Sequence, residues 1–115
     1  MSRGSVYVAA KYEDHVRVRE VQNTLRLCGW DITYDWTTNE QVSPEQAQND
    51  FDGVRNADAF VLIAERDLPY CGALVELGIA LALEIPVHII GHALDDRCIF
   101  LKLPSITYGI ESLLK

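Results

Sequence analysis

Two carboxylates occur in the sequence at positions where a charged side chain could do chemistry. Glu76 lies within GALVELGIALAL, an otherwise almost wholly apolar stretch. Burying a carboxylate without a partner costs on the order of several kcal/mol, so this residue either faces solvent or serves a function. Asp50 lies upstream in the acidic segment QNDFDGVRNAD, in which Asp58 is most simply a turn residue before a strand. Two such carboxylates can supply a nucleophile and a proton-handling group.

The position of Glu76 leaves two interpretations open. The carboxylate could simply complement the positive N-terminal end of its helix. In the second interpretation the helix N-terminus holds Glu76 ionised at the carboxyl end of a strand, where α/β sheets bind their ligands. Asp50, taken alone, is equally well explained as a structural residue.

Composition narrows the classes of function. The chain has 115 residues and a formal net charge of −7, which argues against a protein that binds the phosphate backbone of a nucleic acid polymer. The cysteines Cys28, Cys71 and Cys98 and the three histidines show no metal-ligand spacing, so neither a metal nor a cofactor is expected. No export leader and no membrane span are expected, and a reducing cytoplasm is the expected compartment.

Short apolar runs alternate with amphipathic or apolar helical patterns along the chain. Strands are expected at residues 5–10, 31–36, 59–64 and 86–91, with a weaker one at 105–108. Helices are expected at residues 13–27, 44–56 and 73–83, with a last helical turn at the C-terminal end. Residues 37–44 are expected to form a loop, in which Ser43 caps the helix that opens with Pro44.

This alternation predicts a single α/β domain over residues 1–115, with a mainly parallel sheet of about five strands and helices on both faces. Such sheets bind ligands outside the carboxyl ends of their strands, so the loops after Ala10, Trp36, Ala64 and Gly91 are the places where a site is expected. By analogy of fold, the strand order is expected to be 2-1-3-4-5.

The segments AQNDFDGVRNADAFVLIAE and GALVELGIALALEIPVHIIG resemble the nucleoside 2-deoxyribosyltransferase family. VYVAAKYED is similar to the first strand and substrate loop of that family, and CIFLKLPSITYGIESLL to the C-terminal end of its short members. The resemblance implies a flavodoxin-like three-layer sandwich. It also implies that Glu76 is the nucleophile that captures the sugar, and that Asp50 assists it by positioning or proton handling.

The resemblance also implies a substrate-binding set around these two carboxylates. Its members are Ala9, Ala10, Lys11, Tyr12, Trp36, Tyr70 and Gly72. Tyr70 is itself a departure, because transferases of the family tend to have an acidic residue in that loop and monophosphate-hydrolysing relatives a serine. Tyr12 and Lys11 are equally explained as inert loop residues, and Trp36 as a buried residue at the sheet edge.

The expected activity is cleavage or transfer at the N-glycosidic bond of a 2′-deoxynucleoside or its 5′-monophosphate, through a covalent glycosyl-Glu76 intermediate. Hydrolysis is expected to be at least a substantial side reaction. Lys11, Arg17 and Arg19 are the cations that could meet a 5′-phosphate, although helix arginines are more often solvated. A homodimer or higher homo-oligomer is expected. The alternative is a non-catalytic nucleotide-binding or regulatory module with the same fold.

Overall fold

A computed structural model describes residues 2–38 and 42–115, in which strands and helices alternate from end to end. The strands are β1 (Gly4–Ala9), β2 (Trp30–Ile32), β3 (Ala59–Ile63), β4 (Val87–Ile90) and β5 (Ile106–Tyr108). The helices are α1 (His15–Leu27), α2 (Pro44–Arg55), α3 (Gly72–Ala82) and α4 (Glu111–Leu114), and 3₁₀ turns form η1 (Tyr12–Asp14), η2 (Trp36–Thr38) and η3 (Ile99–Lys102).

The five strands form one parallel sheet in the order β2-β1-β3-β4-β5. The predicted parallel α/β class and strand order are therefore confirmed. The chain runs from β1 to β2 on one side and then returns to place β3 on the other side of β1. The order reverses at this point, and there the carboxyl ends of β1 and β3 leave room for a ligand.

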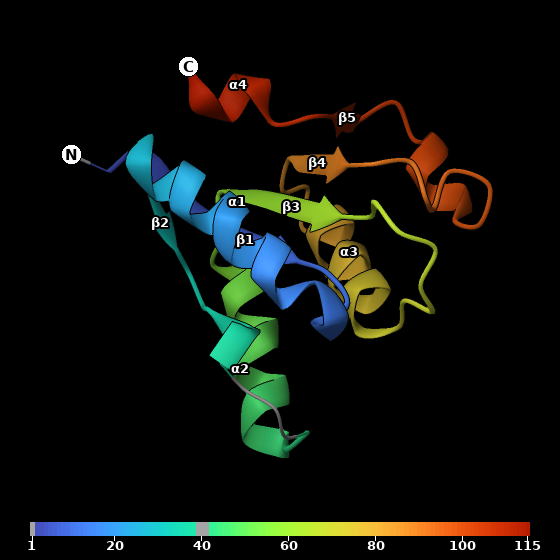
Figure 1. The fold of residues 1–115 in the computed structure, drawn as a ribbon, viewed down its shortest axis with the longest axis horizontal. Helices are drawn as coiled ribbons and strands as arrows, with labels where there is room; N and C mark the ends of the chain where they lie inside the picture. The colour runs from blue at the N-terminus through green and yellow to red at the C-terminus, as the bar shows by residue number, and fades with distance from the viewer. Residues whose placement is uncertain (1, 39–41) are drawn as a thin grey trace.

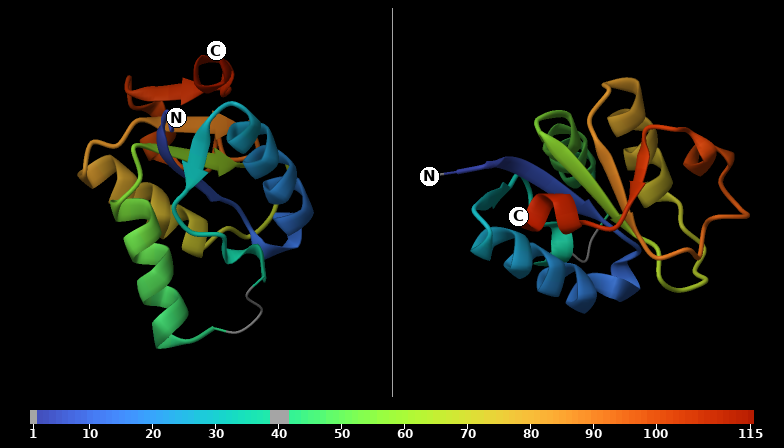
Figure 2. Two further views of the ribbon diagram at one scale, coloured as in Figure 1. Left: turned by 90° about the vertical axis from the view of Figure 1, so that its left-hand side faces the viewer. Right: turned by 90° about the horizontal axis from the view of Figure 1, so that it is seen from above.

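Helices cover both faces of the sheet, as Figures 1 and 2 show. Seen from above in Figure 2, α2 and α3 lie on one side of the strands, whereas α1 and α4 lie on the other. The two buried apolar clusters have the same division. One joins the sheet to α2 and α3, and the other joins it to α1 and α4.

Alternation along β1 sends successive side chains to opposite layers. Val6 and Val8 face α1, whereas Tyr7 and Ala9 belong to the cluster beneath α2 and α3. Tyr7 is fully buried, and its ring stacks on that of Phe60, its neighbour on β3, with centroids 6.1 Å apart. The only tyrosine of β1 is thereby aimed at the layer that carries Asp50 and Glu76.

Two boundaries differ from the sequence-based prediction by more than one residue. The second strand ends at Ile32, because the Asp35 carboxylate accepts hydrogen bonds from the backbone N–H and hydroxyl of Thr37 and turns the chain. Trp36 consequently lies in η2 and not in the strand. Glu13 and Asp14 belong to η1, so α1 begins at His15. Of the loop predicted at 37–44, residues 39–41 lie outside the described part of the chain.

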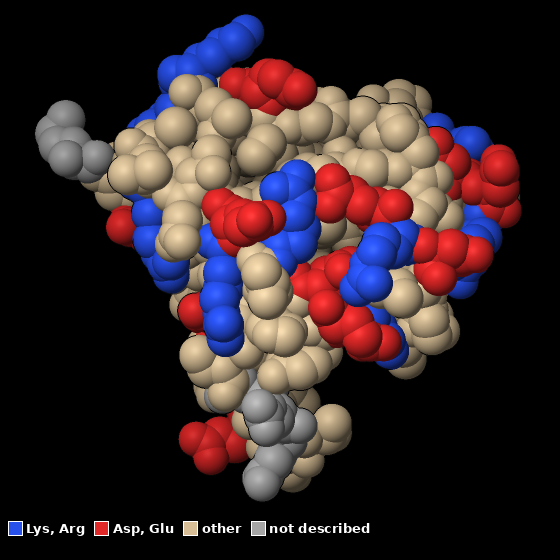
Figure 3. Space-filling model, viewed as in Figure 1, with Lys and Arg blue, Asp and Glu red and all other residues tan. Residues whose placement is uncertain are grey.

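Charges of both signs are interleaved on the surface. On the face shown in Figure 3, lysine and arginine side chains lie beside aspartate and glutamate, and they form no continuous basic surface. None of the helices in residues 2–38 and 42–115 is long and apolar enough to cross a bilayer.

Helix α2 comes close to β1 at Gly53. A Cβ atom at this position would lie 2.9 Å from Cβ of Tyr34 and 3.0 Å from the Tyr7 ring, both closer than ordinary packing allows. The carbonyl of Gly53 accepts a hydrogen bond of 2.7 Å from the Thr33 hydroxyl, which ties the helix to the segment after β2. Glycine is therefore required here by close approach.

We expect Gly53→Ala to lower the melting temperature by at least about 4 °C, since forcing a methyl group against Tyr7 costs about 1–3 kcal/mol and outweighs the better helix propensity of alanine. Gly78→Ala in α3 is the matched control, because a Cβ there meets nothing within 4 Å, and it should raise the melting temperature slightly. Thermal unfolding followed by circular dichroism measures both. Equal effects of the two substitutions would contradict the packing argument.

Candidate active site

A cavity of about 280 Å³ opens at the carboxyl ends of β1 and β3, beneath the first turns of α3. This volume is near the lower end of the range of about 300–1,000 Å³ that small-molecule sites occupy. Its lining comes from the loops after β1, β2 and β3 and from α2 and α3. The lining residues are Tyr7, Ala10, Lys11, Tyr12, Trp36, Val42, Asp50, Tyr70, Cys71, Gly72, Ala73 and Glu76.

The Tyr7 hydroxyl is the centre of the polar floor of this cavity. It donates a hydrogen bond of 2.6 Å to Oε2 of Glu76, which extends from the second turn of α3. Burial and the nearby Glu76 and Asp50 carboxylates raise the pKa of Tyr7 far above its ordinary value. The phenol therefore keeps its proton and acts as a fixed donor to the carboxylate.

Asp50 approaches the same hydroxyl from α2. Burial raises the pKa of Asp50, and a hydrogen bond with Tyr7 opposes this rise. Oδ1 of Asp50 is buried without a hydrogen-bond partner among the described residues. An unsatisfied buried acceptor is costly in a folded protein, so this oxygen is available to a donor on a ligand.

Burial also changes the protonation of Glu76. It raises the pKa of Glu76 from 4.5 to about 8; the Tyr7 hydrogen bond lowers this value and the charge of Asp50 raises it. The sequence predicted a carboxylate that the helix N-terminus keeps ionised. The structure differs, because burial outweighs the helix end at a residue placed in the second turn. In the unliganded protein Glu76 is mostly protonated at neutral pH.

Aromatic rings form one wall of the cavity. The Trp36 indole is held by a 2.7 Å hydrogen bond from its N–H to the carbonyl of Val8, which fixes the ring at the end of β1. The Tyr12 ring lies 6.3 Å from the Trp36 ring and stacks on His15 with centroids 5.0 Å apart. Such a wall offers a flat apolar surface to a planar ligand.

The opposite rim belongs to the loop between β3 and α3. The Tyr70 ring is buried and its hydroxyl donates a 3.0 Å hydrogen bond to the carbonyl of Arg66. Gly72 opens α3 and leaves free space, since a Cβ there would meet nothing within 4 Å. Lys11 enters from the other side, in the turn that follows β1.

Eight of the nine site residues named from the sequence line this cavity. They are Glu76, Asp50, Ala10, Lys11, Tyr12, Trp36, Tyr70 and Gly72. Ala9 does not line it. It lies on the same face of β1 as Tyr7, but its short side chain is fully buried in the core cluster beneath α2 and α3.

Tyr7 is the main residue that sequence analysis missed, together with Val42, Cys71 and Ala73 of the lining. The phenol hydroxyl inside the otherwise apolar run VYVAA was the available signal, because a buried phenol needs a partner.

Two of the three cations proposed to bind phosphate, Arg17 and Arg19, have other partners in the structure and do not line the cavity. Arg17 forms an ion pair with Glu65 on the surface, at 2.9 Å between Nε and Oε1. Arg19 donates to the hydroxyl and carbonyl of Thr37, at 3.0 and 3.2 Å. Lys11 is the cation among the lining residues of the cavity.

A second, larger cavity of about 690 Å³ lies between α3 and η3. Apolar side chains form most of its lining, and it contains neither Asp nor Glu. The smaller cavity, with its two carboxylates and a tyrosine, is therefore the candidate site. Within residues 2–38 and 42–115, no group of three or more His, Cys, Asp or Glu side chains is placed to hold a metal ion.

Comparison with known proteins supports the fold. No family model matches the chain, and no curated protein sequence matches it. Among solved structures, the CMP N-glycosidase BcmB from Clostridium botulinum shares the fold with a TM-score of 0.66 and 21% identity, over 91% of this chain and 87% of BcmB. A conserved protein from Enterococcus faecalis V583 matches with a TM-score of 0.58 and 15% identity, over 99% of this chain and 86% of the other. These similarities confirm the flavodoxin-like architecture that the family resemblance implied.

The raised pKa of Glu76 makes stability depend on pH. The folded state keeps the Glu76 proton up to about pH 8, whereas the unfolded chain releases it near 4.5, so this contribution is full below pH 4.5 and is lost as the pH rises to 8. Glu76→Gln cannot ionise. We expect its melting temperature to match that of the wild type near pH 4.5 and to exceed it by at least about 5 °C at pH 8.5.

Thermal unfolding of both proteins between pH 4.5 and 9 measures this difference. Glu84→Gln, at an exposed position, is the control and should leave the pH profile unchanged. A constant difference between Glu76→Gln and wild type across the range would show that Glu76 titrates in the folded protein as it does in the unfolded chain.

Proposed function

We propose that this protein cleaves the N-glycosidic bond of a nucleoside 5′-monophosphate, with Glu76 as the group that attacks the sugar. The observation that carries the proposal is the placement of the Asp50 and Glu76 carboxyls around the Tyr7 hydroxyl in one cavity at the switch point of the sheet. The fold shared with a CMP N-glycosidase supports the same reaction class.

In the proposed reaction, an ionised Glu76 oxygen forms a bond to C1′ of the sugar while the bond from C1′ to the base nitrogen breaks. The base leaves with the electron pair of that bond and takes up a proton. The result is a glycosyl ester on Glu76, which water then hydrolyses to release the sugar phosphate and restore the carboxylate. A base in place of water would give transfer of the sugar instead.

The same cluster supplies the proton that the leaving base needs. Glu76 has a pKa of about 8, so about one molecule in ten carries the ionised form at pH 7. Tyr7 donates to that carboxylate and orients one oxygen, which leaves the other free to attack. Asp50, with an unsatisfied oxygen beside the same hydroxyl, is the group that takes up the proton lost by Glu76 and passes it to the leaving base.

The lining of the cavity fits the two ends of such a substrate. Trp36 and Tyr12 offer a stacking surface for the base. Lys11 offers a charge for the 5′-phosphate, which compensates for the two carboxylates that would otherwise repel it. Substrates with ribose and with 2′-deoxyribose both belong in the test.

A non-catalytic nucleotide-binding module is the second candidate. The observation in its favour is Tyr70, a buried aromatic ring where the resemblance places an acidic residue or a serine.

The expectation of a homo-oligomer also stays a prediction. The exposed Ile99 and Phe100 beside the apolar cavity are surfaces that a second copy could cover.

Chromatography tests the proposed activity by measuring the release of free base. The substrates are CMP, dCMP, cytidine, deoxycytidine and their purine counterparts. We expect Glu76→Gln to fold and to retain less than a tenth of the wild-type rate, because the amide keeps the shape but cannot attack. Asp50→Asn should reduce the rate on the order of 10²–10⁴. Wild-type protein incubated with a 2′-fluoro substrate analogue should trap the intermediate. Mass spectrometry should then show the added mass of the glycosyl group on Glu76.

A rate above a tenth of wild type in Glu76→Gln would exclude the covalent role. Nucleotide binding by the wild type with no base release from any substrate would favour the binding module instead. An unchanged rate in Asp50→Asn would return that residue to a structural role.

Lys11 makes a separate prediction about the 5′ end of the substrate. A charge-assisted phosphate contact contributes about 1.5–3 kcal/mol, so monophosphates should be cleaved at least tenfold better than nucleosides, measured as kcat/KM. Lys11→Gln should remove this preference and leave nucleoside cleavage nearly unchanged. Lys102→Gln, an exposed lysine on η3, is the control and should retain it. Equal rates on both substrate forms in the wild type would show that Lys11 does not contact phosphate.

A further inference from the structure

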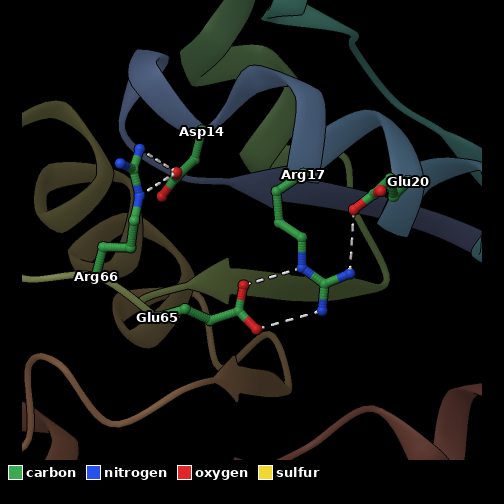
Figure 4. Close-up of polar contacts among 5 residues, drawn as sticks. All are labelled: Asp14, Arg17, Glu20, Glu65 and Arg66. Carbon is green, nitrogen blue, oxygen red and sulfur yellow. Dashed lines mark hydrogen bonds and ion pairs between the residues drawn. The ribbon is translucent and has the colours of Figure 1, made fainter.

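Two ion pairs join the loop between β3 and α3 to the segment that follows β1. Figure 4 shows Arg66 reaching Asp14, and Arg17 placed between Glu65 and Glu20. Glu65 and Arg66 are adjacent in the loop, whereas Asp14 and Arg17 lie one turn apart at the start of α1. The loop contributes an acid, Glu65, to one pair and a base, Arg66, to the other, so it fits this surface in one register only.

The two pairs differ in the burial of their carboxylates. The Asp14 side chain is only 9% exposed, whereas that of Arg66 is 55% exposed. Both Nε and Nη2 of Arg66 contact Oδ1 of Asp14, at 2.8 and 2.5 Å. Oδ2 of Asp14 is buried with no hydrogen-bond partner among the described residues. Arg66 is thus the ion-pair partner that the structure gives this carboxylate, and removal of the arginine would leave a buried charge without compensation. Arg17 and Glu65 are 42% and 38% exposed, and ion pairs of that kind contribute little.

The pair of Asp14 and Arg66 is connected to the cavity on both sides. The backbone N–H of Asp14 donates to the carbonyl of Lys11 at 2.9 Å and closes the turn that carries Lys11 and Tyr12. On the other side the carbonyl of Arg66 accepts the hydrogen bond from the Tyr70 hydroxyl. One carboxylate therefore links the turn after β1, which forms one rim of the cavity, to the ring of Tyr70, which forms the other.

We propose that Asp14 is a positioning residue of this site, which through Arg66 fixes the loop that carries Tyr70, Cys71 and the start of α3. Asp14 does not line the cavity and contacts no reacting group. It acts by holding two walls at a fixed separation, so that a nucleotide meets a formed cavity and does not have to order the loop as it binds. The inference rests on the proposed function only for the identity of the ligand.

The test uses the full chain with Asp14→Asn, which keeps the shape of the side chain but removes its charge, and Arg66→Gln, at a solvent-exposed position. Hydrogen exchange of the amides in residues 65–71 is expected to become at least tenfold faster in both. The KM for the best substrate should rise at least tenfold while kcat stays within about threefold, because Tyr7, Asp50 and Glu76 are untouched. Arg66→Lys should lie between Arg66→Gln and the wild type.

Arg17→Gln is the matched control, because it breaks the exposed pair between the same two segments. It should change both loop exchange and KM by less than threefold. Equal effects of Arg17→Gln and Asp14→Asn, or an unchanged KM together with unchanged loop exchange in Asp14→Asn, would overturn the proposal.

Titration of CMP by calorimetry separates this proposal from the proposed function. If the wild type binds CMP without releasing cytosine, the catalytic proposal fails, and the dissociation constant replaces KM in the comparison above. If CMP does not bind, faster loop exchange in Asp14→Asn but not in Arg17→Gln supports the positioning role, and unchanged exchange refutes it.

Discussion

The hydrogen bond from Tyr7 to Glu76 is the interaction on which the arrangement of this protein depends. A carboxyl group is placed inside the layer between the sheet and two helices, where water is largely excluded, and one phenol from β1 satisfies it. For the two groups to meet, β1 must turn a polar side chain toward α3, and α2 must come near enough to bring Asp50 to the same hydroxyl. Gly53 permits that approach, because any larger residue would displace the Tyr7 ring.

Burial of the Glu76 carboxyl lowers the stability of the folded protein at neutral pH, and the same burial can favour binding of positive charge. Burial of Glu76 raises its pKa to about 8, so the folded protein is less stable at neutral pH than it would be with an uncharged amide in place of this carboxyl. A carboxylate that is ionised with difficulty is stabilised by positive charge nearby. In the proposed reaction, the transition state of N-glycosidic cleavage would carry such charge on the sugar, at the place where Glu76 and Asp50 converge. On that proposal, stability lost in the free protein would be converted into affinity for the charged transition state.

The sequence was sufficient to predict the parallel sheet, because this follows from alternating apolar runs. The strand order came from analogy of fold, and most of the residues around the cavity came from the family resemblance. The sequence did not predict Tyr7, since a tyrosine in a strand is ordinary and only the facing helices show why its hydroxyl is placed there.

The sequence analysis also placed Trp36 in a strand, because the Asp35 turn that ends β2 is made by side-chain hydrogen bonds and not by periodicity. It named Ala9 as a binding residue, although the methyl group of Ala9 is fully buried in the core cluster beneath α2 and α3. It also left Arg17 and Arg19 open as phosphate ligands, and their actual partners lie 48 and 18 residues away along the chain.

These long-range partners show how a protein of net negative charge can present a site for an anionic ligand. Most of its arginines in this region are neutralised by neighbours: Arg17 by Glu65 and Glu20, and Arg66 by Asp14. Lys11 differs from these arginines, because it lines the cavity. If the protein acts on a nucleotide as proposed, the two carboxylates that attract a cationic sugar would repel a phosphate placed equally near. On that proposal the substrate would bind in one orientation, with the phosphate toward Lys11 and the sugar toward Tyr7, so that charge helps to orient the bond to be cleaved.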